Sequence, residues 1–312
     1  MNPLSQAAAL LSEQGLDAGG MLARSDIGLW GSSVTVGVSG GADSVGLALL
    51  AWLSGRRVVA IQVDHGLRPE SPAEGPFVAA QLARFSIPVI QKRVRIEPGP
   101  NLEERARIAR MAVLGDCATA HTLDDQAETL LANLFRGASL AGVAAMEAGR
   151  RHPVLRLRRT ELRQLCSALS VEWIEDPSNL DPRFVRNRIR HEVIPLVNEI
   201  TGRDVAPILA RTAGMNREYL EAAGRLADEA REPLELPGVL LRMWLGSKIR
   251  ECSGLRLSSY HLSGVEGVAR GQLRAHNLPD SIVVRRRGDR LELSGPGMPA
   301  AWIDLNPGSE ER

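Results

Sequence analysis

Short β-branched runs alternate with apolar helical patterns through the first 136 residues of the chain. Strands are predicted at residues 34–38, 57–63, 88–96 and 117–120. Helices are predicted between and after them, at residues 44–53, 77–84, 102–114 and 123–136. This alternation indicates an α/β fold with a parallel, doubly wound sheet that helices cover on both faces. Ligands of such sheets bind at the carboxyl ends of the strands, so we expect the chemistry there.

The pattern changes after residue 150. A turn rich in Pro, Asn and Asp at 176–182 precedes a helix predicted at 183–200. Two further helical patterns, at 204–231 and 238–252, precede a strand pair at 281–293. We therefore predict two domains, a sheet domain of residues 1–205 and a smaller, mainly helical accessory domain of residues 206–312.

Composition excludes several classes of protein. Apolar residues make up 44% of the chain and charged residues 24%, as in soluble globular proteins. The apolar stretch at 45–53 is far shorter than the roughly 20 residues that span a bilayer, and the first thirty residues do not match a secretory signal. Cys117, Cys166 and Cys252 form no CxxC pair, which argues against a disulfide framework or a zinc ribbon. We expect no membrane segment and a cytoplasmic location.

The basic residues are unusual although the net charge is only +1, because 36 of the 38 are arginine. Residues 150–190 hold ten arginines against five acidic residues, a local surplus that suits RNA phosphates. The alternative is a solvated helix face in an arginine-rich chain. In the helix predicted at 183–200, arginines alternate with an apolar stripe of Val185, Ile189, Val193 and Leu196. A second basic cluster comprises residues 285–287 and Arg290.

A phosphate-binding loop is predicted between the first strand and the first helix, with the sequence Ser39-Gly40-Gly41-Ala42-Asp43-Ser44. Its two glycines allow close approach of a ligand, and the amides at a helix start suit a phosphate or pyrophosphate. A carboxylate at Asp43 repels phosphates unless a cation lies between them, so Asp43 is a predicted Mg²⁺ ligand. The structural alternative is a tight turn that caps the helix. Neither GxxxxGK[ST] nor GxGxxG occurs in the chain.

Other polar residues follow the ends of the second and fourth predicted strands. Asp64 and His65 are expected beside the loop, near the nucleotide, although a polar turn explains them equally well. His121 ends the fourth strand, and Asp125 and Glu128 share one side of the next helix. This trio suits a cationic substrate or a metal and proton handling, while the alternative is that the carboxylates complement the helix dipole.

The loop resembles the SGGxDS signature of the PP-loop, or N-type, ATP pyrophosphatases. Further motifs are similar to those of the tRNA(Ile)-lysidine synthetase family: Asp64-His65-Gly66-Leu67, Glu103 with Ala106-Arg107, residues 121–130, Arg136-Gly137, residues 175–179 and residues 184–196. The resemblance covers about residues 34 to 200. The departures include Met111, Thr122, the position of His152 and a short segment between residues 110 and 117.

The resemblance implies a two-step ligation on a tRNA(Ile) with a CAU anticodon. ATP adenylates the 2-carbonyl oxygen of the wobble cytidine, and free L-lysine then displaces AMP. It implies that ATP binds to residues 39–44, Asp64 and His65, with Mg²⁺ on Asp43. The implied catalytic residues are Asp43, His121, Asp125 and Glu128, of which Asp125 and Glu128 also bind lysine. The implied tRNA-binding residues are Arg107, Arg186 and Arg190.

Three alternatives differ in what they require of the sequence. A tRNA thiolase on the same fold needs cysteine pairs, which this chain lacks. A PP-loop synthetase of small molecules does not need the block at 175–196 or the arginine surplus. An idle nucleotide- or RNA-binding protein does not need Asp43, His121, Asp125 and Glu128 together. Longer family members carry an additional C-terminal RNA-binding domain, so the last module here is expected to be the smaller first accessory domain. The sequence does not distinguish a monomer from a homodimer.

Overall fold

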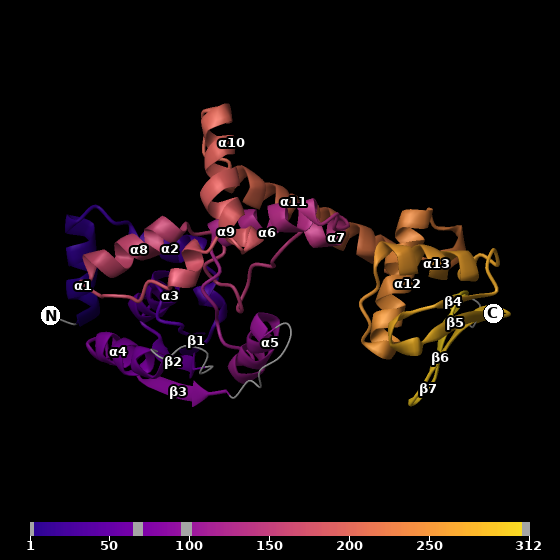
Figure 1. Ribbon diagram of the computed structural model, residues 1–312, viewed down its shortest axis with the longest axis horizontal. Helices are drawn as coiled ribbons and strands as arrows, with labels where there is room; N and C mark the ends of the chain where they lie inside the picture. The colour runs from indigo at the N-terminus through magenta and orange to yellow at the C-terminus, as the bar shows by residue number, and fades with distance from the viewer. Residues whose placement is uncertain (1–2, 65–70, 95–101, 308–312) are drawn as a thin grey trace. The chain divides into compact units, whose positions relative to one another are not determined.

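The structure is a computed structural model that describes residues 3–64, 71–94 and 102–307 (Figure 1). The chain forms two compact units, one of residues 1–138 and 142–214 and the other of residues 139–141 and 215–312. They part inside helix α11 (Ala206–Asp228). The boundary between two domains that we predict after residue 205 stays a prediction.

The first unit is built on a parallel sheet of β1 (Ser33–Gly37), β2 (Arg57–Asp64) and β3 (Val89–Arg93), in that order. Alternate residues of β2 face opposite sides, because side chains of a strand alternate with period two. Val58 and Ala60 belong to the main core, whereas Val63 packs with residues around α5. Both faces are therefore covered, and the predicted doubly wound α/β fold is confirmed.

The predicted fourth strand at 117–120 is reduced to one parallel bridge between Val36 and Ala118. The amide of Ala118 donates to the Thr35 carbonyl, and the amide of Gly37 donates to the Ala118 carbonyl, both at 2.8 Å. The next residue leaves the sheet, because the Thr119 amide donates to the carbonyl of Arg151 instead. The segment still delivers His121 to the carboxyl edge of the sheet, where β1 also ends.

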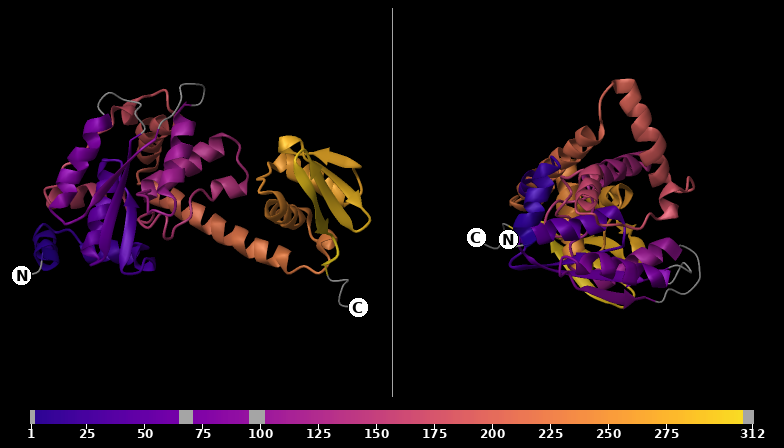
Figure 2. Two further views of the ribbon diagram at one scale, coloured as in Figure 1. Left: turned by 90° about the horizontal axis from the view of Figure 1, so that it is seen from below. Right: turned by 90° about the vertical axis from the view of Figure 1, so that its left-hand side faces the viewer.

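Helices surround this sheet (Figures 1 and 2). They are α1 (Pro3–Glu13), α2 (Ala18–Arg24), η1 (Ile27–Leu29), α3 (Ala42–Leu53), α4 (Ser71–Ala83), α5 (Leu102–Leu114), α6 (Leu123–Phe135) and α8 (Arg159–Ala168). The short helix α7 (Leu140–Val143) is not one of them, because the division between the two units falls inside it. Helix α3 is apolar on nearly all sides because it is central, with nine buried residues. It packs closely on α8, since a Cβ at Gly46 would lie 2.9 Å from the Cβ of Leu162. This contact fixes the start of α8 near the start of α3.

The helix predicted at 183–200 consists of α9 (Val185–Arg188), the π-helical turn η3 (Ile189–Val193) and α10 (Ile194–Thr201), after the short η2 (Pro177–Leu180). The predicted apolar stripe is wrong as a buried face. Ile189 is buried, but Val185 and Leu196 are 63% and 54% exposed. Arg186 and Arg190 of this segment face α6 instead, because two buried carboxylates there require cationic partners.

The second unit combines the last part of α11 with η4 (Pro233–Glu235), α12 (Gly238–Ser253), α13 (Ser259–Ala269) and η5 (Pro279–Ser281). Helices α12 and α13 pack on an antiparallel sheet of β4 (Ala275–Asn277), β5 (Val283–Arg287), β6 (Arg290–Gly295) and β7 (Met298–Asp304), in that order (Figure 2). The predicted strand pair is thus half of a larger sheet. Of the basic cluster there, Arg287 pairs with Glu292 and Arg286 donates to the Ala269 carbonyl.

No helix among residues 3–64, 71–94 and 102–307 has the length and apolar character needed to cross a membrane.

Candidate active site

The predicted phosphate loop connects β1 to α3 with the backbone that its glycines allow. Gly40 has φ of +93°, a conformation that side-chain-bearing residues rarely adopt. A Cβ at Gly40 would lie 2.9 Å from the Cδ1 of Ile174, whose amide donates to the Gly40 carbonyl. Gly41 is the N-cap of α3 and provides no side-chain cap. The first amides of α3 therefore have no partner inside the helix and point toward the space in front of the loop.

The two serines of the loop fix its shape. The Ser39 amide donates to Ser44 Oγ at 3.1 Å, and Ser44 Oγ donates to the Gly41 carbonyl at 2.8 Å. The hydroxyls of Ser39 and Ser44 lie 3.3 Å apart. Ala42 between them is buried. Ser44 thus closes the turn, and the hydroxyl of Ser39 lies beside that of Ser44.

One carboxylate oxygen of Asp43 is held by a hydrogen bond. Its Oδ2 accepts from Arg159 Nε at 3.1 Å, whereas its Oδ1 is buried and has no hydrogen-bond partner among the described residues. Burial raises the pKa of Asp43 to about 6, although Arg159 opposes that shift. A buried carboxylate oxygen without a partner, beside a phosphate cradle, is suited to a divalent cation.

The described residues contain no cluster of three or more His, Cys, Asp and Glu that could hold a metal ion by themselves. A Mg²⁺ at Asp43 would therefore complete its coordination with phosphate oxygens and water, as Mg²⁺ commonly does in nucleotide sites. The donor set fits Mg²⁺ that arrives with a nucleotide, and it does not fit a permanently bound structural metal.

The other predicted nucleotide and RNA contacts are only partly described. Asp64 ends β2 at the same sheet edge as the loop, and its carboxylate lies 3.7 Å from Arg93 Nε. His65 lies outside the described residues. Arg107 belongs to α5, and its side chain is likewise outside the described part of the structure.

Helix α6 begins with a capping box. The amide and the hydroxyl of Thr122 both donate to Asp125 Oδ2 at 2.8 Å, and the Asp125 amide donates back to Thr122 Oγ1. Asp125 therefore uses one oxygen in the capping box and presents the other to the site. Glu128 lies one turn later on the same side and is 1% exposed.

Three arginines from three elements, α8, α9 and η3, meet these two carboxylates. Arg159 Nη2 lies 2.9 Å from Asp125 Oδ1 and 3.1 Å from Glu128 Oε1. Arg186 reaches Asp125 Oδ1 at 2.9 Å and Glu128 Oε2 at 2.8 Å. Arg190 Nε lies 2.7 Å from Glu128 Oε1. The predicted lysine-binding pair and two of the predicted tRNA-binding arginines thus form one ionic cluster.

The cluster is electrically balanced when Asp43 is counted with it, because three guanidinium groups face three carboxylates. Burial raises the pKa of Asp125, but Arg159 and Arg186 outweigh it and bring that pKa down to about 2. Burial lowers the pKa of Arg159, but Asp125 and Glu128 outweigh it and raise that pKa above its usual value. Asp125 is therefore a permanent anion at neutral pH, which suits the binding of a cation.

His121 lies at the start of α6 beside a second histidine. Its Nδ1 is 3.1 Å from His152 Nδ1, and both rings contact Thr119 Oγ1, at 3.1 and 2.8 Å. The Thr119 hydroxyl donates its proton to the Arg151 carbonyl at 3.0 Å, so it accepts from the imidazoles. Burial and the neighbouring His121 lower the pKa of His152 to about 4, which keeps that ring neutral.

Sequence reasoning missed Arg159, the residue with the most carboxylate partners in the site. One signal was available: Arg158 and Arg159 stand together at the start of α8, where the helix dipole disfavours cations. In the structure both residues contact the carboxylate of Asp124. Arg158 pairs with Asp124 at 2.9 Å and with Asp204, and the Arg159 amide donates to Asp124 Oδ2 at 2.8 Å.

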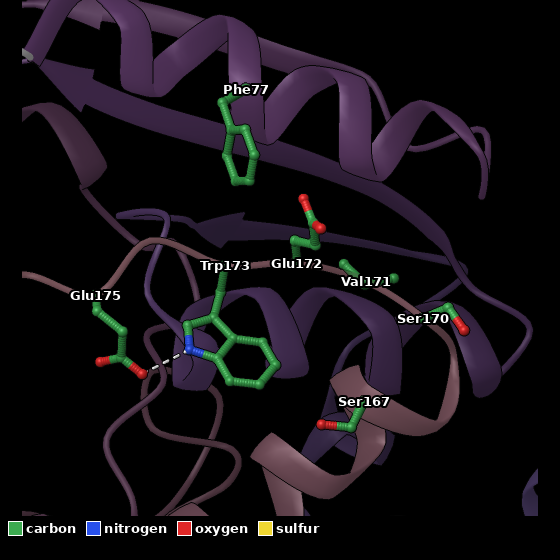
Figure 3. Close-up of a pocket in the computed structure, with 7 residues that line it drawn as sticks. All are labelled: Phe77, Ser167, Ser170, Val171, Glu172, Trp173 and Glu175. Atoms are coloured by element: carbon green, nitrogen blue, oxygen red, sulfur yellow. Dashed lines mark hydrogen bonds between the residues drawn. The ribbon is translucent and has the colours of Figure 1, made fainter.

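A separate pocket of about 580 Å³ lies behind the loop and is shown in Figure 3. It is lined by Phe77, Ser167, Ser170, Val171, Glu172, Trp173 and Glu175. The Trp173 indole donates to Glu175 at 2.8 Å, and these two residues flank Ile174, which backs Gly40. None of the predicted site residues lines this pocket.

Comparison with known proteins identifies the family. The PP-loop domain matches residues 25–197. The tRNA(Ile)-lysidine synthase of Nocardia farcinica is 42% identical over 280 residues, which cover 86% of each chain. The chain belongs to the tRNA(Ile)-lysidine synthase family. The synthase of Rhodococcus erythropolis is 38% identical and also covers 86% of both chains. That of Thermus thermophilus is 37% identical over 84% of this chain but only 57% of its own length.

The comparison confirms the resemblance drawn from the motifs, and the match to the PP-loop domain includes residues 39–44. It leaves the roles of single residues open. The chain spans little more than half of the Thermus relative.

Proposed function

We propose that this chain converts the wobble cytidine of a CAU-anticodon tRNA(Ile) into lysidine, using ATP and free L-lysine and releasing AMP and pyrophosphate. One observation carries the proposal: the guanidinium of Arg159 holds both Asp43 of the PP-loop and the acidic pair Asp125 and Glu128. The Arg159 guanidinium therefore borders both a phosphate site and a cation site. A reaction between an activated phosphate ester and an amine requires two such sites to be adjacent. The names of the relatives supply the substrates.

In the first step the 2-carbonyl oxygen of the cytidine attacks the α-phosphorus of ATP, and pyrophosphate leaves. The PP-loop amides and the hydroxyl of Ser39 bind the phosphates, Ser44 holds the turn that presents them, and Asp64 and His65 remain proposed contacts of the nucleotide. Asp43 would hold Mg²⁺ through the Oδ1 that has no partner among the described residues. When bound, Mg²⁺ offsets negative charge on the phosphates and on the departing pyrophosphate.

In the second step the ε-amine of lysine attacks C2 of the cytidine, and AMP leaves with the former carbonyl oxygen. The incoming ammonium binds to Asp125 and Glu128. With its pKa near 2, Asp125 suits binding of the ammonium and is a poor acceptor of its proton. We assign proton acceptance to His121, because an imidazole nitrogen can accept a proton and this ring lies next to Asp125 at the start of α6.

Lysine has to exchange with arginines that already contact the acidic pair. Arg186 is the most exposed of the three, at 42% of its side chain, followed by Arg190 at 22%. Both lie on the segment where the sequence predicts tRNA binding. A tRNA phosphate that draws these two guanidinium groups outward would uncover the carboxylates for lysine, and Arg107 on α5 is proposed as a further RNA contact.

The thiols of the chain do not favour the thiolase alternative. Cys117, Cys166 and Cys252 are free, and the first two are buried. Burial raises the pKa of the Cys166 thiol to about 12 and also raises that of Cys117, so neither is a reactive thiolate at neutral pH. Free thiols are also what we expect of a cytoplasmic protein.

Transfer of lysine to RNA tests the proposal. The chain is incubated with Mg²⁺, ATP, labelled lysine and transcripts of tRNA(Ile) that differ only at the wobble base. We expect label in the transcript with a wobble cytidine and none with uridine, adenosine or guanosine there. Equal labelling of a methionine tRNA with the same CAU anticodon would contradict the tRNA(Ile) specificity, and failure to label any transcript would contradict the reaction.

A further inference from the structure

Arg159 joins two parts of the site that lie on different elements. Its Nε binds Asp43 Oδ2, while its Nη2 binds both Asp125 and Glu128. The side chain is 17% exposed, and the backbone amide is fixed by Asp124. In the described part of the chain, no acceptor lies within hydrogen-bonding distance of its Nη1. This guanidinium therefore has the two N–H donors of Nη1 to spare beside the phosphate site.

We propose that Arg159 is a positioning residue that couples the nucleotide half of the site to the amine half. By holding Asp43 Oδ2 it turns Oδ1 toward the metal and the phosphates, and by holding Asp125 and Glu128 it keeps their charge balanced until an ammonium arrives. This inference rests on the proposed function.

The coupling follows from competition for one guanidinium. We expect the phosphates of a bound nucleoside triphosphate in front of the PP-loop. When the guanidinium of Arg159 turns away from the acidic pair, its Nη1 faces that region. An arginine binds phosphate oxygens strongly, so the nucleotide draws Arg159 away from Asp125 and Glu128. The acidic pair then keeps two of its three guanidinium partners, Arg186 and Arg190, and binds an ammonium more tightly. By linkage, lysine must strengthen ATP binding by the same factor.

Lysine in place of Arg159 would keep the charge and lose the bridge. A single ammonium is a compact group without the planar fork that spans carboxylates on both sides. The neighbouring Arg158 provides a matched control. It opens the same helix, is also part-buried, and pairs with Asp124 and Asp204 rather than with Asp43, Asp125 or Glu128.

Calorimetric titration with ATP tests the coupling without turnover, because no tRNA is present. Each variant is titrated with ATP in Mg²⁺, with and without saturating lysine. In the wild type we expect lysine to tighten ATP binding by about tenfold, within the usual range of coupling between sites. In Arg159→Lys we expect ATP binding to weaken by about tenfold or more and the effect of lysine to disappear. Arg158→Lys should behave as the wild type.

The outcomes separate the inference from the proposed function. If the wild type labels tRNA with lysine but Arg159→Lys and Arg158→Lys show the same ATP affinity and the same response to lysine, only the role of Arg159 is overturned. If the wild type binds no ATP, the proposed function fails and the inference fails with it. If circular dichroism shows that Arg159→Lys is unfolded, the titrations of the wild type still test the coupling. The absence of any effect of lysine on ATP binding by the wild type would overturn it.

Discussion

Asp43→Asn is expected to abolish AMP formation and, at the same time, to make the chain more stable. The carboxylate is buried and its Oδ1 has no partner in the described part of the structure, so ionisation at neutral pH costs folding free energy. A neutral amide of the same shape removes that cost, which is on the order of 1 to 3 kcal/mol for a pKa raised to about 6 from 3.8. The amide also removes the proposed Mg²⁺ ligand. Because 1 kcal/mol corresponds to about 2–4 °C in a unit of this size, the melting temperature should rise by about 2–12 °C.

The stabilisation by Asp43→Asn has a defined pH dependence. A carboxyl whose folded-state pKa is raised binds its proton more readily in the folded chain, so the wild type gains stability as the pH falls through 6 toward 3.8. The variant's advantage is therefore full above pH 6 and disappears below about pH 4. Thermal melts at pH 7.5 and pH 4 measure it, and chromatography of nucleotides measures AMP. Asp26→Asn, which loses an ion pair with the largely exposed Arg156, is the control and should not be stabilised. A variant that melts lower than wild type at pH 7.5, or that still forms AMP, would contradict this role.

Glu128→Gln is expected to destabilise the chain, in contrast to Asp43→Asn, and to reduce the transfer of lysine to tRNA. Glu128 is 1% exposed and contacts Arg159, Arg186 and Arg190 within 3.1 Å. Removing its charge leaves three guanidinium groups with only Asp125 and Asp43 beside them, and breaking a buried ionic cluster from one side costs about 3–5 kcal/mol. We expect lysine incorporation to fall by at least about a hundredfold, because a cation then meets a net positive site.

Glu192→Gln is the matched control for Glu128→Gln. Glu192 pairs with Arg188 on the same segment as Arg186 and Arg190, but both side chains are more than half exposed. Exposed pairs contribute little to stability, so neither the melting temperature nor lysine incorporation should change. Equal melting of the two variants would contradict the claim that Glu128 organises the arginine cluster.

The sheet and the PP-loop could be predicted because they depend on local patterns. β-branched runs with period-two burial gave the strands, and two glycines between a strand and a helix gave the loop. The fourth strand was overestimated because pattern alone does not show that the Thr119 amide leaves the ladder for Arg151. In the second unit, β4 was missed because Ala275–Asn277 has too few residues for an alternating pattern.

The interior of the site could not be predicted from local patterns. Periodicity assigned Val185 and Leu196 to a buried face, whereas the structure exposes them and turns Arg186 and Arg190 inward. The reason is a long-range requirement: Asp125 and Glu128 are buried, and buried charges need partners. Arg159 met the same requirement from a third element, α8. Residues that break a local rule, as two arginines at a helix start do, are where such requirements become visible in a sequence.

The central claim is that the PP-loop directs ATP to the 2-carbonyl oxygen of the wobble cytidine, and an isotope transfer tests it most directly. A tRNA(Ile) transcript carrying ¹⁸O at C2 of that cytidine is incubated with the chain, Mg²⁺, ATP and lysine, and the AMP is analysed by mass spectrometry. The account predicts one ¹⁸O atom in the phosphate of each AMP released with a lysylated transcript. Unlabelled AMP alongside lysylated RNA would show that this oxygen is never bonded to the α-phosphorus and would contradict the account.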